Sequence, residues 1–278
     1  MSLQNALAAL SGRMRLPCQA AAVLAIAVGV ALVLTGGPGR AVGPTLGFIG
    51  FALLVIALIG TFLGPAVRAE PLELASPVHG RWEALNSPAS KVPSHGTHAY
   101  GQAYAVDLIY APDGVHRPEF GKAGGSFLRP ERFPGFGQPV YAPAEGVIVR
   151  AVDRAQDHRS RSSWAALALF FLEAIPREAM GPTGVLGNHV VVRLPDGSHF
   201  VLAHLQRGSV TVRRGDRVTA GTSIGRCGNT GNTTEPHLHC QRQDLASVFL
   251  ATGLPWTIPG GVPENGAPAD LRPASSTS

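Results

Sequence analysis

Two histidines separated by one residue are the side chains best suited to chemistry. They lie in the run Pro236-His237-Leu238-His239. In an extended strand, residues two apart point to the same face, so both imidazoles would project together. Imidazole is the commonest protein ligand of zinc, and such a pair suits one metal ligand beside one group that acts on a substrate. The H-x-H spacing is short, so the surrounding elements decide its interpretation.

Short runs that alternate apolar and polar residues surround this pair and are typical of β-strands. A Pro-Asp-Gly turn at 195–197 joins two of these runs as a hairpin. Strands at this spacing with few helices predict an antiparallel β-domain with a barrel-sandwich-like sheet. The runs are residues 104–110, 146–152, 188–194 and 199–205.

One segment of this domain departs from the strand pattern. Residues 162–180, SSWAALALFFLEAIPREAM, are apolar and begin with serines that suit a helix N-cap. We predict one inserted helix. Packing on the sheet is its simplest role, while a rim of a substrate groove and a contact with a membrane surface are alternatives.

Residues 1–69 carry most of the apolar excess of the chain. Residues 17–35 and 45–64 are uncharged, and each is close to the ~20 residues that a bilayer core requires. We predict a two-helix transmembrane hairpin. A signal peptide is the alternative for the first stretch, but the stretch is long for that role and lacks a clear cleavage motif.

The charges leave the membrane topology open. Arg13 and Arg15 precede the first span, and only Arg40 lies between the spans. The positive-inside rule therefore favours a cytoplasmic N-terminus, and two spans return the rest of the chain to the cytoplasm. The net charge of +5 suits an anionic surface such as cell wall or lipid headgroups. No basic run or RNA-type aromatic pattern accompanies it, so we expect no nucleic-acid partner.

The C-terminal segment and the cysteines add two further expectations. Residues 256–278 are rich in Pro, Gly, Ala and Ser, which predicts a disordered tail. Three cysteines cannot form a full disulfide framework. Cys227 and Cys240 flank the histidine pair, and they are interpreted either as free buried thiols or as a pair on neighbouring strands.

The run that leads into the histidine pair, GDRVTAGTSIGRCGNTGNTTEPHLHC, resembles the last block of the lysostaphin/LytM-type zinc metallopeptidases, which cut peptidoglycan cross-links. The family pattern reads roughly G-D-x-V-x-x-G-x-x-I-G-x-x-G-x-T-G-x-S-x-x-P-H-L-H-F. Cys240 stands where the family usually has an aromatic residue. Upstream, GNHVVV, LPDG, LAHL and PVYAPAEGVIVRA resemble further family blocks in the same order. The resemblance covers about residues 76–245 and implies a metallopeptidase domain at 76–255.

The resemblance also implies roles for individual residues. It makes His239 and Asp107 ligands of one Zn²⁺, with His204 and His237 acting on the substrate. The family usually has a histidine four residues before the aspartate, and this chain has Ala103 there. The segment SHGTHAYGQ offers His95 instead, with His98 as the alternative first ligand. If neither reaches the metal, the site is a degenerate one.

The resemblance predicts a zinc-dependent endopeptidase that hydrolyses peptide amide bonds of peptidoglycan. It implies a bacterial cell-membrane protein whose catalytic domain is extracytoplasmic, against the charge bias. Expected partners are a peptidoglycan peptide, the lipid bilayer and an unidentified protein activator. The alternative is a weak or degenerate member that activates a wall hydrolase or binds the wall. A biotin- or lipoyl-carrier reading of GDRVTAGTSIG fails because neither Lys91 nor Lys122 lies near that turn.

Overall fold

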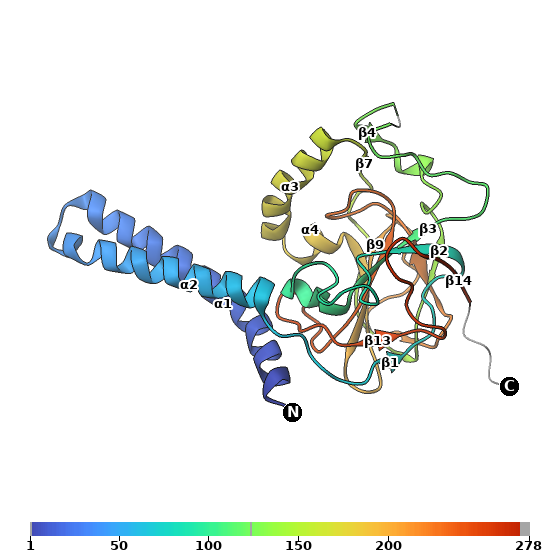
Figure 1. The fold of residues 1–278 in the computed structure, drawn as a ribbon, viewed down its shortest axis with the longest axis horizontal. Helices are drawn as coiled ribbons and strands as arrows, with labels where there is room; N and C mark the ends of the chain where they lie inside the picture. Colours follow the sequence, from blue (N-terminus) through green and yellow to red (C-terminus); the bar gives the residue numbers. More distant parts are fainter. Residues whose placement is uncertain (1, 123, 273–278) are drawn as a thin grey trace.

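The computed structural model describes residues 2–122 and 124–272, in which a helical hairpin projects from one side of a β-domain (Figure 1). The hairpin consists of α1 (Leu3–Thr35), the short η1 (Pro38–Ala41) and α2 (Gly43–Leu63). Both long helices have the length and the apolar composition to cross a bilayer.

Helix α1 begins earlier than residue 17, where the apolar stretch starts. Ser2 caps it by accepting a hydrogen bond from the Asn5 amide (3.2 Å), and the alanines and leucines that follow are strong helix formers. Pro17 lies inside the helix, and the first turns run at an angle to the rest (Figure 1), as expected where proline removes a backbone hydrogen bond.

The two helices of the hairpin pack through small residues spaced seven apart. A Cβ atom on Gly29 would lie 2.6 Å from the Gly43 carbonyl oxygen, and one on Gly43 would lie 2.6 Å from the Gly29 carbonyl oxygen. Only glycine allows so close an approach of the two backbones, which is a common way for helices to associate in a bilayer. The buried residues are Ala8, Arg15, Ala22 and Gly29 of α1 and Gly43, Gly50, Ala57 and Thr61 of α2.

The hairpin is fixed to the β-domain by two arginines near its base. The buried Arg15 guanidinium lies 3.2 Å from the Glu178 carboxylate and 4.4 Å from the centre of the Tyr100 ring. Arg13 pairs with Asp244 at 3.1 Å. These contacts hold α1 directly against the domain.

The β-domain is built on an eight-stranded sheet in the order β10-β6-β8-β9-β12-β3-β2-β14, with every neighbouring pair antiparallel. This confirms the predicted fold class. The strands are β2 (Gly80–Leu85), β3 (Val106–Tyr110), β6 (Gly146–Val152), β8 (Asn188–Arg193), β9 (His199–Leu205), β10 (Arg217–Val218), β12 (Leu238–Gln243) and β14 (Pro268–Leu271).

Short elements surround this sheet. Helix α3 (Trp164–Ala179) is the inserted helix, and α4 (Pro182–Leu186) follows it. Three further strand pairs are β1 (Leu72–Glu73) with β13 (Trp256–Thr257), β5 (Pro139–Tyr141) with β11 (Ser223–Arg226), and β4 (Phe127–Leu128) with β7 (Ser160–Arg161); the 3-10 turns are η2 (Ala99–Tyr104) and η3 (Pro130–Arg132).

The central strands are buried on both faces, and the two faces differ. Leu108, Leu202 and Cys240 belong to the large apolar core on one face, whereas Val201 and Ala203 belong to a smaller cluster on the other. Alternation along each strand places Asp107 and His239 on the second face, opposite Ala203. The polar residues discussed below therefore lie on the face with the smaller apolar cluster.

The C-terminal segment differs from the expected disordered tail at 256–278. Residues 256–257 form β13, and residues 268–271 form β14 at the edge of the main sheet. Trp256 packs against Phe200 with ring centroids 4.9 Å apart, and its indole nitrogen donates to the Tyr104 carbonyl (2.8 Å). Burial of apolar side chains such as Trp256 offsets the loss of conformational entropy when this Pro- and Gly-rich segment becomes ordered. Residues 273–278 lie outside the described residues.

Candidate metal centre

Asp107 is the residue around which the polar cluster is arranged. It lies on β3 directly opposite His239 of β12. One carboxylate oxygen, Oδ1, is 2.8 Å from His239 Nδ1, and the other, Oδ2, accepts a hydrogen bond from the Asn86 amide (2.9 Å). The pairing of two adjacent strands thus fixes the distance between the carboxylate and the imidazole.

His95 reaches the same carboxylate from the loop before η2. Its Nε2 lies 3.1 Å from Asp107 Oδ2, and its ring centroid is 5.1 Å from that of His239. The potential ligand atoms of His95, Asp107 and His239 all lie within 4.8 Å of one another. Two imidazoles and a carboxylate at this separation fit a zinc ion, which takes such ligands at about 2.0–2.2 Å.

His98 occupies a different position from His95. It is the residue that precedes η2, and its backbone N–H donates to the Thr61 carbonyl at the end of α2 (2.8 Å). It is not among the residues of the His–Asp–His group. Of the two alternative first ligands, the structure brings only His95 to Asp107.

His237 and His204 lie next to the His–Asp–His group and complete the cluster. His237 Nε2 lies 3.5 Å from Asp107 Oδ1, and the His204 ring centroid is 4.8 Å from that of His237. The His204 centroid is 5.8 Å from that of His239. The structure therefore gathers Asp107, His204, His237 and His239 as the sequence pattern suggested, with His95 added from the loop.

A β-bulge turns His204 toward this cluster. Simple alternation along β9 would place it on the face of Leu202, in the large core. Instead the register with β8 shifts, so that His189 faces both Ala203 and His204, and His204 takes a left-handed backbone conformation (φ 61°). Such a conformation is costly for a residue with a side chain and is typical of functional positions.

Hydrogen bonds to main-chain and side-chain oxygens orient three of the rings. The Nδ1–H of His204 donates to the Thr230 carbonyl and that of His237 to the Glu235 carbonyl, both at 2.8 Å. Each ring then directs Nε2 into the cluster. His239 is reversed, because its Nε2–H donates to Gln241 Oε1 (2.8 Å) and leaves Nδ1 facing Asp107.

Their electrostatic surroundings shift the pKa values of His204 and His237 in opposite directions. Burial lowers the pKa of His204 well below its usual value, and the neighbouring His237 and His239 lower it further. Burial opposes charge on His237 as well, but the Asp107 carboxylate outweighs it and raises the pKa of His237. The pKa of Asp107 is held well below its usual value because His95 and His237 overcome the effect of burial.

Two contributors to the cluster, Asn86 and Gln241, are not among the residues predicted from the sequence. Asn86 holds one Asp107 oxygen, and Gln241 holds His239. Gln241 in turn donates to the Tyr100 carbonyl (2.7 Å) and to Gln243. The signal available for Gln241 is its place two residues after His239, on the same strand face.

The other histidines lie outside the cluster. His189, considered as a groove-lining residue, is fully buried, and its Nδ1 donates to the Gly187 carbonyl (2.8 Å). His158 Nε2 bonds the Gly231 carbonyl (2.9 Å), and His79 stacks on Tyr141 with centroids 4.3 Å apart. Cys227 and Cys240 are free buried thiols in the part of the chain that the structure describes.

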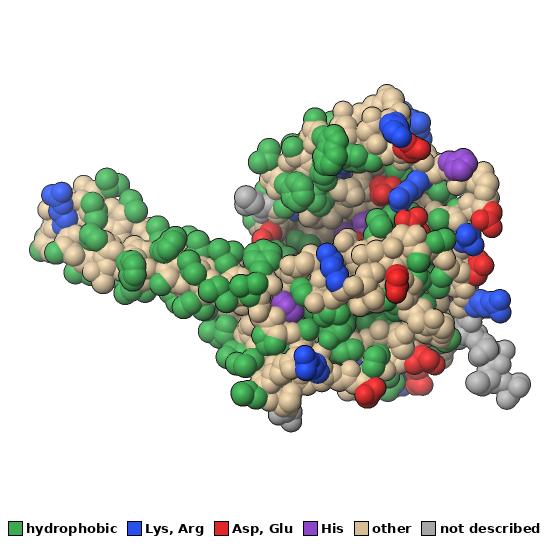
Figure 2. Space-filling model, viewed as in Figure 1, with side chains coloured by type: hydrophobic (Ala, Val, Ile, Leu, Met, Phe, Trp, Pro, Cys, Tyr) green, Lys and Arg blue, Asp and Glu red, His purple; other side chains and the backbone are tan. Residues whose placement is uncertain are grey.

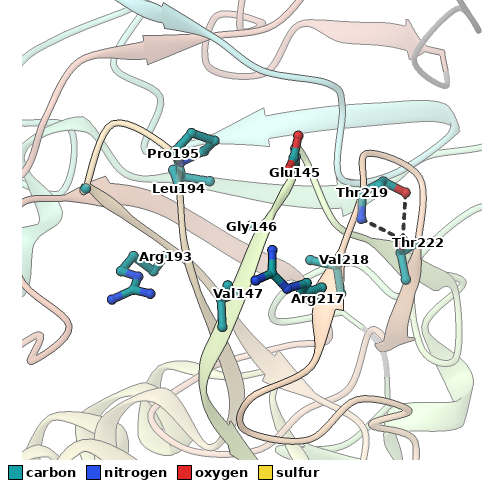
Figure 3. A pocket seen from close by; sticks show the side chains of 11 residues that line it. Glu145, Gly146, Val147, Arg193, Leu194, Pro195, Arg217, Val218, Thr219 and Thr222 are labelled. Carbon is teal, nitrogen blue, oxygen red and sulfur yellow. Dashed lines mark hydrogen bonds between the residues drawn. The ribbon is translucent and has the colours of Figure 1, made fainter.

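A groove of about 600 Å³ lies beside the cluster, between α3 and the segment after β3. Thr234 and Glu235, three and two residues before His237, line it together with Trp164 and Phe120. A hollow of about 650 Å³ lies elsewhere, between β10, β6 and the β8–β9 turn (Figure 3). Its lining includes Arg193, Arg217 and Glu145 but none of the cluster residues.

Comparison with known proteins finds a similarity to one family of peptidases. Residues 176–248 match the model of peptidase family M23. A stretch of 53 residues is 40% identical to the peptidoglycan DD-endopeptidase ShyA of Vibrio cholerae serotype O1, which covers 19% of this chain and 12% of that protein. The matched stretch is thus a small part of that relative's length.

Solved structures give a partial superposition. The catalytic domain of the antimicrobial peptidase lysostaphin from Staphylococcus simulans is 24% identical, with a TM-score of 0.32, and the match covers 63% of this chain and 88% of that one. A zinc-containing peptidase from Vibrio cholerae is 18% identical, with a TM-score of 0.27 and coverage of 54% and 48%. The sequence matches thus make part of the β-domain similar to peptidase family M23, over residues 176–248.

Proposed function

We propose that this protein is a zinc-dependent endopeptidase that hydrolyses peptide amide bonds of peptidoglycan cross-links. The observation that carries the proposal is the convergence of His95, Asp107 and His239 on one point, with two further histidines beside them. A site that only held a metal for structural purposes would be closed by a fourth protein ligand, whereas three ligands leave a position for chemistry.

His95, Asp107 and His239 are the residues that would hold the metal. When bound there, zinc supplies a Lewis acid that polarises the scissile carbonyl. Asn86 holds Asp107 and Gln241 holds His239 by hydrogen bonds (2.9 and 2.8 Å), so the ligands are oriented before a metal arrives.

His204 and His237 would act on the substrate through their Nε2 atoms. His204 Nε2 suits a base that accepts a proton during the attack. Its ring is buried, and it hydrogen-bonds the Thr230 carbonyl rather than a carboxylate. His237 lies beside Asp107 (3.5 Å), which favours its protonated form, and it would donate a hydrogen bond to the negatively charged oxygen that develops. No glutamate is required for either role.

The zinc content of the full-length chain in detergent tests the metal site. We expect about one zinc per chain in the wild type, and little in His239→Ala or His95→Ala. His98→Ala is the matched control and retains the metal, because His98 lies outside the group. Less than about a tenth of an equivalent in the wild type, after zinc has been supplied, would overturn the proposal.

Turnover needs a separate assay on purified peptidoglycan, with the release of new amino groups as the readout. His204→Ala and His237→Ala should keep zinc and lose turnover. The displaced first ligand, with Ala103 at the usual position, favours a second candidate, a binding or activating protein. Full zinc occupancy with no turnover in the wild type would favour that candidate.

We further propose that α1 and α2 cross the cell membrane and that the β-domain is extracytoplasmic. A C-terminal reporter that is active only outside the cytoplasm tests the sidedness. Activity of that reporter is expected. A cytoplasmic β-domain, which the arginines at 13 and 15 favour, would exclude peptidoglycan as the substrate while leaving a peptidase of other peptides.

A further inference from the structure

Helix α3 exposes its apolar side chains rather than burying them. Trp164 is 75% exposed, Phe171 64%, Leu172 71% and Met180, the residue after the helix, 71%. Among the side chains described on this helix, every exposed position carries an apolar residue. An ordinary surface helix shows the opposite arrangement, with charged residues outward.

The charged residues of α3 point toward the rest of the protein. Glu173 pairs with Arg161 of β7 and with Arg177 (3.2 Å), and Glu178 pairs with Arg15 of α1 (3.2 Å). The inner face therefore carries the ion pairs beside the buried Ala166, and the outer face consists of hydrocarbon and aromatic rings. Such an inverted helix indicates that the outer face contacts an apolar phase.

The size of the exposed surface supports that conclusion. Burying one large apolar side chain stabilises a structure by about 1.5–3 kcal/mol, and α3 forgoes this at several positions. A continuous apolar patch of this kind is uncommon on a soluble surface and marks a contact with another molecule or a membrane. Phe120 extends the patch, since its ring lies edge-on to Trp164 with centroids 5.1 Å apart.

The position of the hairpin indicates what covers this face. Figure 1 shows α3 on the side of the β-domain from which the hairpin projects, and α3 runs across the direction of the hairpin. In Figure 2 hydrophobic side chains gather over α3 and along the hairpin. The Arg15–Glu178 pair joins the base of α1 to the end of α3. A bilayer crossed by α1 and α2 would therefore lie alongside α3.

We propose that α3 lies in the interface of the same bilayer that the hairpin crosses, with its apolar face among the lipids. The proposal rests on the proposed insertion of α1 and α2. Tryptophan favours the headgroup level of a bilayer, and a helix with one wholly apolar face lies flat at that level. Because Trp164 also lines the groove beside His237, the membrane would then border the entrance to the candidate active site.

Tryptophan fluorescence of the full-length chain provides the test. The chain has three tryptophans, and Trp82 and Trp256 are buried in the β-domain. The protein is reconstituted into phosphatidylcholine vesicles whose acyl chains carry bromine, either near the headgroup or near the bilayer centre. We expect the shallow bromine to quench about one third of the emission, that of Trp164, and the deep bromine to quench less. Trp164→Phe should abolish this quenching.

Alternative occupants give other results. Trp164 emission quenched by aqueous iodide but not by brominated lipid would show that the face is exposed to water, and it would overturn the proposal. Emission that resists both quenchers would show that protein covers the face, either a second copy or another partner, and would also overturn it.

Extraction at alkaline pH separates this proposal from the insertion of the hairpin. A chain that stays in the membrane but shows no lipid quenching of Trp164 contradicts only the role of α3. A chain that is extracted contradicts both.

Two surface variants test whether the outer face of α3 itself contacts the lipid. The double variant Phe171→Ser and Leu172→Ser should reduce lipid quenching of Trp164 at least about twofold, because it makes the outer face polar. Val115→Ser is the matched control, since Val115 is an exposed apolar residue of the loop after β3, and it should leave the quenching unchanged. Equal quenching in both variants would overturn the proposal.

Discussion

The candidate metal centre and the outer face of α3 reverse the usual arrangement of polar and apolar residues in opposite ways. At the metal centre a carboxylate and several imidazoles are buried on a sheet between apolar clusters. On α3 large apolar side chains face outward while the carboxylates face inward. Burying polar groups and exposing apolar ones both cost free energy.

The difference between the two regions lies in how each cost is offset. Within the candidate metal centre the polar groups are paired with one another. The Asp107 carboxylate lies within hydrogen-bond distance of Asn86, His95 and His239, and His204 bonds a backbone carbonyl. The outer face of α3 has no such internal compensation among the described residues. One region is complete apart from a small ion, whereas the other requires a large apolar surface from outside.

Replacing Asp107 by asparagine should produce the largest effect, because this isosteric change removes the charge at the centre of the cluster. We expect zinc to be lost and turnover to fall at least about a thousandfold, or about 4 kcal/mol of transition-state stabilisation. Zinc analysis and the peptidoglycan assay provide the measurements. Asp113→Asn, at a carboxylate 88% exposed, is the control and should retain both properties. Full turnover in Asp107→Asn would remove the metal centre from the mechanism.

Replacing a phenylalanine by alanine should affect stability differently in the β-domain core and on the outer face of α3. Phe200 is fully buried against Trp256, and Phe200→Ala should lower the free energy of unfolding by about 3–5 kcal/mol. Phe171 is 64% exposed, and Phe171→Ala in detergent should change it by less than about 0.5 kcal/mol. Denaturant unfolding followed by near-UV circular dichroism measures both. A loss in Phe171→Ala as large as in Phe200→Ala would show that α3 packs against protein.

A buried histidine outside the cluster should make stability depend on pH. Burial lowers the pKa of His189 to about 4, while the unfolded chain takes up the proton near 6.5. As pH falls below 6.5 the unfolded state binds the proton first, so stability decreases toward pH 4. Between pH 7.5 and pH 5 this contributes a loss of about 2 kcal/mol.

The variant His189→Leu tests this origin of the pH dependence. It should be less stable at neutral pH, because the Gly187 carbonyl loses its donor, but its stability should fall less between pH 7.5 and pH 5. Metal-free protein is used for both, so that zinc binding does not contribute. An unchanged difference between the two pH values would assign the effect to other groups.

Removing the Gln241 side chain should weaken zinc binding without abolishing it, because Gln241 acts only through His239. Gln241→Ala should lower zinc affinity about 10–100-fold, since His239 Nε2 loses its acceptor and its ring is no longer held. Gln241→Glu keeps an acceptor and should restore most of the affinity. Gln156→Ala, at an exposed position outside the cluster, is the control. An affinity unchanged in Gln241→Ala would leave the orientation of His239 to its other contacts.

Strand periodicity predicts much of the fold and of the cluster. His237 and His239 share a face because they are two residues apart. Strands β3 and β9 both pair with β12, which brings Asp107 and His204 close to this histidine pair. The choice between His95 and His98 could not be predicted in this way. It depends on the path of the loop before η2 and of η2 itself, in which Tyr100 and Gly101 take left-handed conformations (φ 60° and 71°).

Other features escape the sequence because they depend on neighbours distant in the chain. A helix with many apolar residues, such as 162–180, resembles a buried helix, and only its contacts show which face is outside. The bulge that turns His204 is a register shift between β8 and β9, and no local pattern marks it. Likewise, a Pro- and Gly-rich composition does not reveal that Trp256 packs on Phe200.

The direct contact of α1 with the β-domain limits what the proposed peptidase could reach. Arg15 lies between Glu178 and Tyr100, so α1 packs directly on the β-domain. A domain held in this way cannot swing outward on a tether, and its search for bonds becomes a two-dimensional one. If the chain is the proposed peptidase, the height of a peptide above the lipid would decide whether it is cleaved, whatever the abundance of that peptide elsewhere.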